Sequence, residues 1–342
     1  MDNLGRNHAR VAHLNAYDTL FRAALLCGYG AQAKDLAARM ASVCHEGDGR
    51  SCVEAGTPLL ITVEAPGEAQ LRVGLRLGET LHKAALEALT PEPRAAALAN
   101  AFAALPASQH TGLGYWIFWS LGRQAVFVDL RDPEPDRALE RARLVLVPSE
   151  QARLNRVLSS ATAGRPWGLS IEFDRNNRRI THLYWFTSKP ASAASLVDAF
   201  VPGGWRQVLE VLSHLLSLPG QSGRWLLAIP LESTEEENCL WVGNSAWGLV
   251  PEDDRKHRAI AQLMMRYGGP RDFAEALWSF CQGASESGWR VGRSCEAGVR
   301  AEGPRARLLL TPQLAGGATA EIKSSESLVS AIGPTEEEPF GA

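Results

Sequence analysis

Alternating apolar and polar positions occur along the chain in pairs, and helical patterns separate the pairs. The clearest pair lies within residues 165–188, where alternating runs at 168–173 and 180–186 flank a short charged segment. A period of two predicts strands, and a short polar connection between two such runs predicts an antiparallel hairpin. Residues 194–218 follow with apolar side chains at helical spacing, which predicts a helix.

The same order of helix and hairpin is predicted from one end of the chain to the other. Each further hairpin joins two alternating runs through a polar connection, and each helical stretch repeats apolar residues every three or four positions. The further hairpins are 59–64 with 71–77, 124–131 with 141–147, 223–229 with 238–244 and 289–296 with 305–311; the further helices are 14–40, 79–105, 149–161 and 251–282, beside a lone apolar strand at 115–119.

Five hairpins separated by helices predict an α+β fold with an antiparallel sheet and its helices on one side. Ten strands are enough for such a sheet to close into a barrel, which removes exposed edges. We therefore expect one domain over residues 1–312, a ten-stranded antiparallel β-barrel of five repeated αββα units with the helices outside. Small, acidic and proline residues dominate 313–342 and predict a disordered tail.

The composition limits the kinds of partner and the cellular location that we expect. The 35 basic and 38 acidic side chains are well mixed, which argues against a nucleic-acid partner. No stretch approaches the ~18 apolar residues of a membrane span, and the N-terminus has no secretion signal. We expect a cytoplasmic monomer. The six cysteines lack metal-binding spacing, so reduced thiols and no structural metal site are expected.

Basic and aromatic residues occupy the strand face that would point into the barrel. If the more apolar face of each strand packs against the helices, the inner face carries one or two such residues from every hairpin. Converging arginines are unfavourable unless a polyanion such as pyrophosphate lies between them; the alternative is that each arginine lies near a strand end and reaches water. The inner set is Arg72, Arg76, Arg143, His182, Tyr184, Arg224, Trp241 and Arg307.

Several common catalytic motifs are missing from the sequence. It contains no GxSxG, no GxxxxGK[ST], no HExxH and no aspartate-rich metal motif. A bound diphosphate would therefore be held mainly by direct contacts with cationic side chains, with Mg²⁺ as a helper.

Segments spread over most of the chain carry a family resemblance. They are CVEAG at 52–56, VFVDLR and RARLVLV within 126–147, the GLSIEF to HLYWF hairpin, and WRVG and RARLLL within 289–310. In order and spacing they resemble the ABBA prenyltransferases, and most closely the cyanobactin peptide prenyltransferases. This resemblance implies a ten-stranded barrel that is ringed by helices and binds its substrates inside.

The resemblance also implies roles for individual residues. Glu54 in CVEAG takes the place of the carboxylate that contacts the acceptor and removes its proton, and Glu64 is the reserve. The chain departs from the family at Val145, where relatives carry a second cation or imidazole, and at 308–310, where leucines replace tyrosines. The resemblance implies diphosphate contacts at Arg72, Arg143 and Tyr184, and the inner-face assignment adds Arg224, His182 and Arg307. The expected prenyl and acceptor pocket comprises Trp241, Trp116, Phe186, Glu172 and Glu64.

The implied reaction is transfer of a dimethylallyl group from dimethylallyl diphosphate, with Mg²⁺ as cofactor. The implied acceptor is a Tyr, Trp, His or Arg side chain of a ribosomal, cyclic peptide. Two alternatives remain open: transfer to free tryptophan or another small aromatic compound, and a barrel that binds a ligand without catalysis.

Overall fold

The computed structural model describes residues 60–65, 72–78, 115–120, 123–130, 135–173, 178–216, 225–232, 239–244, 254–268 and 289–314. The strands are β1 (Leu60–Ala65), β2 (Arg72–Gly78), β3 (Tyr115–Ser120), β4 (Arg123–Asp129), β5 (Arg165–Phe173), β6 (Arg179–Thr187), β7 (Trp225–Pro230), β8 (Leu240–Asn244), β9 (Trp289–Val299) and β10 (Arg305–Leu314). The helices are α6 (Pro135–Val145), α7 (Pro148–Ser160), α8 (Pro190–Phe200), α9 (Gly204–Leu216) and α10 (Asp254–Arg266).

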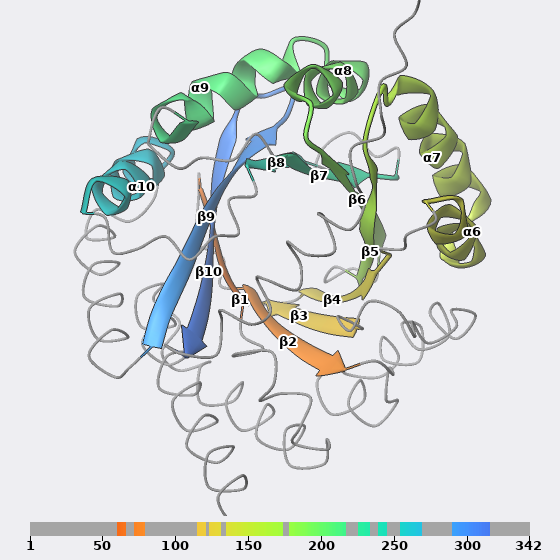
Figure 1. Ribbon diagram of the computed structural model, residues 1–342, viewed down its shortest axis with the longest axis horizontal. Helices are drawn as coiled ribbons and strands as arrows, with labels where there is room; N and C mark the ends of the chain where they lie inside the picture. The colour runs from red at the N-terminus through yellow and green to blue at the C-terminus, as the bar shows by residue number, and fades with distance from the viewer. Residues whose placement is uncertain are drawn as a thin grey trace, which may run out of the picture.

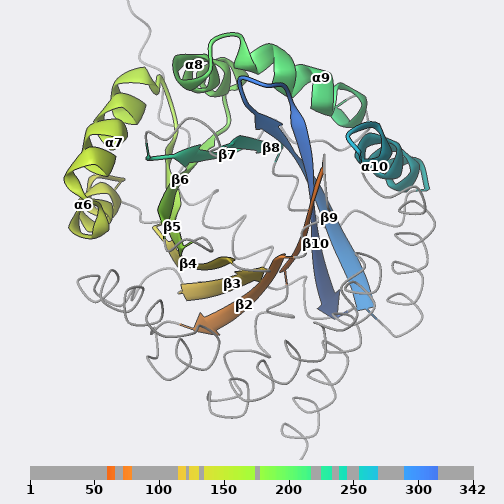
Figure 2. The same ribbon diagram turned by 180° about the vertical axis from the view of Figure 1, so that it is seen from behind.

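Every strand pairs with its neighbours in sequence, and all pairs are antiparallel. β1 pairs with β2 on one side and with β10 on the other, so the ten strands close into a ring. Figures 1 and 2 show this ring with α6 to α10 around its outside. The antiparallel sheet and the outer position of these helices agree with the sequence prediction.

Four of the five predicted hairpins are present with their ends within three residues of the prediction. These are β1–β2, β5–β6, β7–β8 and β9–β10. Most strands of these pairs alternate in polarity and carry β-branched or aromatic residues, whereas β7, WLLAIP, is apolar and buried throughout. β10 extends to Leu314, slightly past the predicted end of the domain.

The second predicted hairpin is wrong in one strand. β4 pairs with β3 and β5, and residues 141–147, predicted as its partner, belong mostly to α6. The apparent alternation there conceals helical spacing, because Ala138, Ala142 and Val145 are all buried. Pro135 in the first turn and Arg143 in the last turn also suit a helix.

The long helix predicted over residues 194–218 is two helices. α8 ends at Phe200 and α9 begins at Gly204. Between them Gly203 has φ +73°, a left-handed conformation that glycine adopts at little cost and that ends a helix. The chain thereby turns, and both helices lie along the outside of the sheet (Figure 1).

The apolar core lies between the outer face of the sheet and the helices. α6 packs on β5, α8 on β6 and β7, α9 on β9 and α10 on β10. Each aliphatic side chain that is fully buried between them contributes about 1.5–3 kcal/mol. Core residues with essentially no exposed surface include Leu154, Val157, Leu169, Ile171, Leu183, Leu196, Val197, Val208, Val211, Leu227, Ile229, Met264, Ala297 and Val299.

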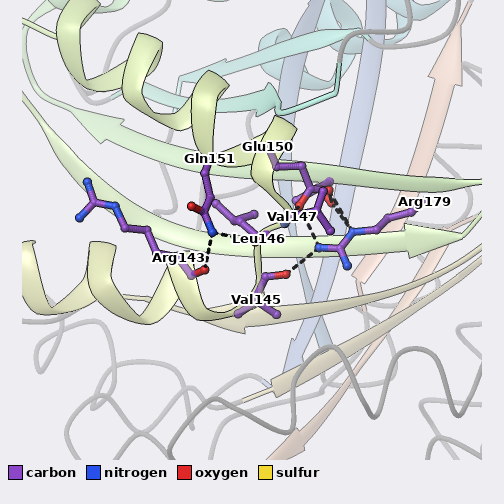
Figure 3. Close-up of polar contacts among 8 residues, drawn as sticks. Arg143, Val145, Leu146, Val147, Glu150, Gln151 and Arg179 are labelled. Carbon is purple, nitrogen blue, oxygen red and sulfur yellow. Dashed lines mark hydrogen bonds and ion pairs between the residues drawn. The ribbon is translucent and has the colours of Figure 1, made fainter.

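A polar cluster anchors α6 and α7 to this outer face (Figure 3). Glu150, only 1% exposed, accepts hydrogen bonds from Arg179 Nε and Nη2 at 2.9 Å each and from Thr181 Oγ1 at 2.6 Å. It also accepts from the backbone N of Val147 at 3.0 Å, which caps α7. Arg179 Nη2 donates to the carbonyl of Val145 at 2.8 Å. We call Glu150 and Arg179 the outer pair.

Several predicted segments lie outside the described residues. They are the helices at 14–40 and 79–105, and the tail beyond Leu314. Across the described helices, none has the length and apolar character needed to cross a membrane.

Candidate functional site

β6 shows which strand face points into the ring. Thr181 and Trp185 face the helices, because Thr181 donates to Glu150 of α7 and Trp185 Nε1 donates to the carbonyl of Ala163 at 3.4 Å. The alternate residues His182 and Tyr184 are partly exposed on the opposite face. They therefore lie on the inner face, as does Phe186, which agrees with the face predicted from the sequence.

Aromatic rings from three neighbouring strands meet on this inner face. Phe127 of β4 and Tyr184 of β6 have ring centroids 5.1 Å apart in an edge-on arrangement. Trp167 of β5 and Phe186 of β6 are also 5.1 Å apart, with rings tilted by 30°. The Arg165 guanidinium lies 5.7 Å from the Phe186 centroid. We call Phe127, Trp167, Tyr184 and Phe186 the aromatic wall.

A buried ion pair lies on the inner face of β9 and β10. Arg307 Nε donates to Glu296 Oε2 at 2.6 Å, and Arg307 Nη2 contacts the same oxygen. Arg307 is 5% exposed and Glu296 is 7% exposed. The Arg307 guanidinium carbon lies 4.1 Å from the ring centroid of Trp241 on β8, close enough for a cation–π interaction. We call Glu296 and Arg307 the inner pair.

Two glycines leave room for this arrangement. A Cβ at Gly298 would come within 2.8 Å of Trp241 and 2.5 Å of Cys239 Sγ, so the indole lies directly against this stretch of β9. A Cβ at Gly243 would approach the Glu296 side chain to 3.0 Å. Both side chains therefore rest against bare backbone, and a methyl group at either glycine would displace them.

Tyr184 connects the two parts of the site. It packs against a buried cluster of Ala228, Cys239 and Trp241 and also contacts Phe127. A continuous row of side chains therefore runs from the inner pair through Trp241 and Tyr184 to the aromatic wall.

Two other predicted residues lie on the inner face. His182 is opposite Ser170 of β5 and Pro230 of β7. Glu172 is opposite Ala125 of β4 and is buried. Opposed residues of antiparallel strands share a face, so Glu172 belongs to the face of Phe127 and His182.

Three predicted residues are placed by strand register, and the structure describes them through their backbone. Arg72 lies opposite Thr62 and Ser120, and Trp116 lies opposite Phe127. Glu64 of β1 lies opposite Arg307 of β10. The remaining two predicted residues, Glu54 and Arg224, lie outside the described residues.

The prediction that Arg143 belongs to the site is wrong, because this residue lies on a helix outside the ring. It lies on the exposed face of α6, which packs against β5 from outside the ring. Its backbone carbonyl accepts a hydrogen bond from Gln151 Nε2 at 3.2 Å, and Figure 3 shows its side chain extending away from the outer pair. Arg143 therefore makes no part of the inner face.

Four inner-face residues were not singled out from the sequence: Phe127, Arg165, Trp167 and Glu296. Phe127 and Glu296 could have been found by extending the inner-face alternation along their strands. The register of β5 shifts between Pro166 and Gly168, so alternation misplaces Trp167. Arg165 precedes the predicted start of its strand.

The described residues offer no metal site of their own. Within them, no three histidine, cysteine, aspartate or glutamate side chains come together closely enough to hold a metal ion. The described side chains do not by themselves form a dedicated Mg²⁺ site.

Comparison with known proteins establishes the fold. No family model and no curated protein matches the chain. The chain is similar to the structure of 5-dimethylallyl tryptophan synthase from Streptomyces coelicolor in complex with DMASPP and Trp, at 14% identity over 90% of this chain and 96% of that chain, with a TM-score of 0.59. It is also similar to prenyltransferase PriB, at 14% identity over 90% and 96%, with a TM-score of 0.63.

A third similar structure is AnaPT from Neosartorya fischeri, at 13% identity over 87% of this chain and 92% of that chain, with a TM-score of 0.58. These neighbours are ABBA-type prenyltransferases. The likeness extends over nearly the full length of each protein, and at this identity it shows a shared fold.

Proposed function

We propose that the chain is a prenyltransferase that moves a dimethylallyl group from dimethylallyl diphosphate to an aromatic acceptor of the indole class. The observation that carries the proposal is the aromatic wall with Arg165 beside it, inside a barrel of the fold found in dimethylallyl tryptophan synthases. An allylic cation needs aromatic faces around it and protection from water, and its leaving group needs cations.

The proposed transfer begins with ionisation of the donor. The bond between the allylic carbon and the diphosphate oxygen breaks, and its electron pair leaves with pyrophosphate. A ring atom of the acceptor then forms a bond to the allylic carbon, and the ring loses one proton to a base.

The aromatic wall would stabilise the developing cation, since ring quadrupoles attract positive charge. Arg165 lies beside this wall, and we propose that it contacts the diphosphate together with Arg72 and Arg224. Fixed guanidinium groups that meet the charge developing on a leaving group are a major source of catalysis. We propose His182 and Tyr184 as further donors to the diphosphate oxygens.

Glu54 is proposed as the base, with Glu64 in reserve. Glu172 is buried on the inner face and is a further carboxylate that could orient an indole N–H. No step of the proposal passes through Mg²⁺.

The acceptor is proposed as tryptophan or a related indole, because the similar structure of 5-dimethylallyl tryptophan synthase contains Trp together with DMASPP. A tryptophan within a cyclic peptide carries the same ring, so the peptide acceptor implied by the cyanobactin resemblance is an outcome of the same test.

The test combines the protein with dimethylallyl diphosphate and, separately, tryptophan and cyclic peptides containing Trp, Tyr, His or Arg. Mass spectrometry would detect an added C5 unit, and heat-inactivated protein is the control. An adduct on tryptophan supports the proposal. An adduct found only on peptides would mean that the acceptor is a peptide side chain rather than free tryptophan. The absence of any adduct, with no binding of an unreactive thio-analogue of the donor, would overturn it.

A further inference from the structure

The inner pair has a different chemistry from the rest of the site, and its charge is the first clue. Arg307 and Glu296 neutralise each other, and both are buried. Removing one partner of a buried pair leaves an uncompensated charge and is strongly unfavourable. If a diphosphate took Arg307 from Glu296, a buried carboxylate would remain beside a polyanion. The inner pair is therefore poorly suited to bind the donor.

The neighbouring strand strengthens this argument. Along one row across β1, β10 and β9, the sequence places Glu64 and Glu296 at the register positions on either side of Arg307. This row holds two acidic residues and one basic residue. Such a composition favours a ligand that brings a hydrogen-bond donor or a positive charge.

Trp241 is the second feature that indicates an aromatic ligand, because several neighbours restrict the position of its indole ring. The Arg307 guanidinium lies over its ring, the ring packs against Gly298, and Tyr184 packs on the cluster that contains it. An indole held in this way offers a rigid surface for another aromatic ring.

We propose that the inner pair and Trp241 form the acceptor half of the interior, and that this half selects an aromatic acceptor carrying an amino group. Glu296 provides the negative charge that favours the amine, and Arg307 limits that charge and fixes Trp241. The donor belongs at the aromatic wall beside Arg165. Arg307 is thus a positioning residue for the acceptor rather than a diphosphate contact. This inference rests on the proposed prenyl transfer.

Three acceptors that share one indole ring test the charge preference. Tryptamine carries only an amine, indole-3-propionate carries only a carboxylate, and tryptophan carries both. The measured quantity is the ratio of kcat/KM for tryptamine to kcat/KM for indole-3-propionate, and the affinity of the donor thio-analogue is measured separately by calorimetry.

The two halves of the pair predict opposite changes. Glu296→Gln removes the negative charge of the pair and should lower the ratio about tenfold, while Arg307→Gln removes its positive charge and should raise the ratio about tenfold, as expected for one charged hydrogen bond. Donor affinity should stay within about twofold in both, because we place the diphosphate at the aromatic wall beside Arg165 rather than at the inner pair.

Two control variants keep the test decisive if a variant folds poorly. Arg307→Lys retains the charge and should keep the ratio, and Glu150→Gln changes the same chemical group outside the ring and should leave the ratio unchanged. Thermal melting of each variant shows how much folded protein is assayed.

Opposite shifts with constant donor affinity support the inference. Unchanged ratios in both glutamine variants would overturn it while leaving prenyl transfer intact. A loss of donor affinity in Arg307→Gln, with a gain in Glu296→Gln, would instead assign Arg307 to the diphosphate. A wild-type protein that forms no adduct with any of the three acceptors and binds no donor analogue would remove the proposed function and this inference together.

Discussion

The outer pair and the inner pair contain the same two residue types but have different surroundings. Glu150 is shared among Arg179, Thr181 and the backbone of Val147, so its lone pairs are satisfied by groups of the fold. Arg307 binds one oxygen of Glu296, and its guanidinium also lies over the ring of Trp241. A buried pair with several neutral partners fixes a helix on a sheet, whereas a pair against an aromatic face shapes an interior.

The largest expected effect is on the outer pair. Glu150→Ala removes the acceptor of Arg179, Thr181 and the Val147 backbone N, and it should lower the free energy of unfolding by about 3 kcal/mol. Urea unfolding measures this loss. The matched control is Glu140→Ala on the exposed face of α6, which should change stability by less than about 0.5 kcal/mol. Equal values for the two variants would show that the outer pair does not anchor α7.

The next largest effect is expected from a substitution at Gly298, where the backbone of β9 packs against Trp241. Gly298→Ala would bring a methyl group within 2.8 Å of the indole, and overpacking of this kind costs about 1–3 kcal/mol. Because the displaced indole no longer fits under Arg307, acceptor KM should rise more than donor KM.

Gly203→Ala separates this steric effect from a general effect of losing glycine. No atom lies within 4 Å of a Cβ at Gly203, but φ is +73°, so the cost is backbone strain of about 1 kcal/mol. Acceptor KM should not change. A rise in acceptor KM in both variants would mean that reduced stability, rather than a displaced Trp241, causes the loss.

Most of the sheet could be predicted from the sequence because most of its strands alternate in polarity and its hairpin connections are polar. The inner face of β6 was also readable, since His182, Tyr184 and Phe186 have the opposite parity to Thr181 and Trp185. The inner pair could not be predicted. Strand alternation places Arg307 on the inner face, but it does not show that Glu296 on the adjacent strand neutralises Arg307. That information depends on register between strands, which a periodic pattern does not specify.

Two errors have local causes. Residues 141–147 contain alternating leucines and also a helical apolar stripe, and α6 forms because Ala138, Ala142 and Val145 bury together. The bulge at Trp167 exchanges the inner and outer faces at the beginning of β5. Simple alternation therefore places Trp167 on the face that packs against the helices.

The aromatic wall provides a smaller, kinetic test of the division between the two halves. Phe127→Leu keeps an apolar side chain but loses the edge contact with Tyr184, which is worth about 0.5–1.5 kcal/mol. Transfer should slow about threefold to tenfold, and more of the donor should be lost to water as dimethylallyl alcohol. Product analysis by chromatography measures the partition. An unchanged partition would indicate that the cation forms away from β4 and β6.

The smallest effect is expected at Arg143, and it contrasts directly with Arg72. Arg143→Ala removes an exposed guanidinium from the outer helix α6, so stability should change by less than about 0.5 kcal/mol and donor affinity should not change. Arg72→Ala should weaken binding of the donor thio-analogue while leaving the melting temperature nearly unchanged, because we propose that this residue contacts the diphosphate. Calorimetry on both variants separates the two positions. Equal donor affinity in the two variants would remove Arg72 from the diphosphate contacts. A loss of donor affinity confined to Arg143→Ala would mean that the donor binds outside the ring. The aromatic wall would then have no part in the transfer.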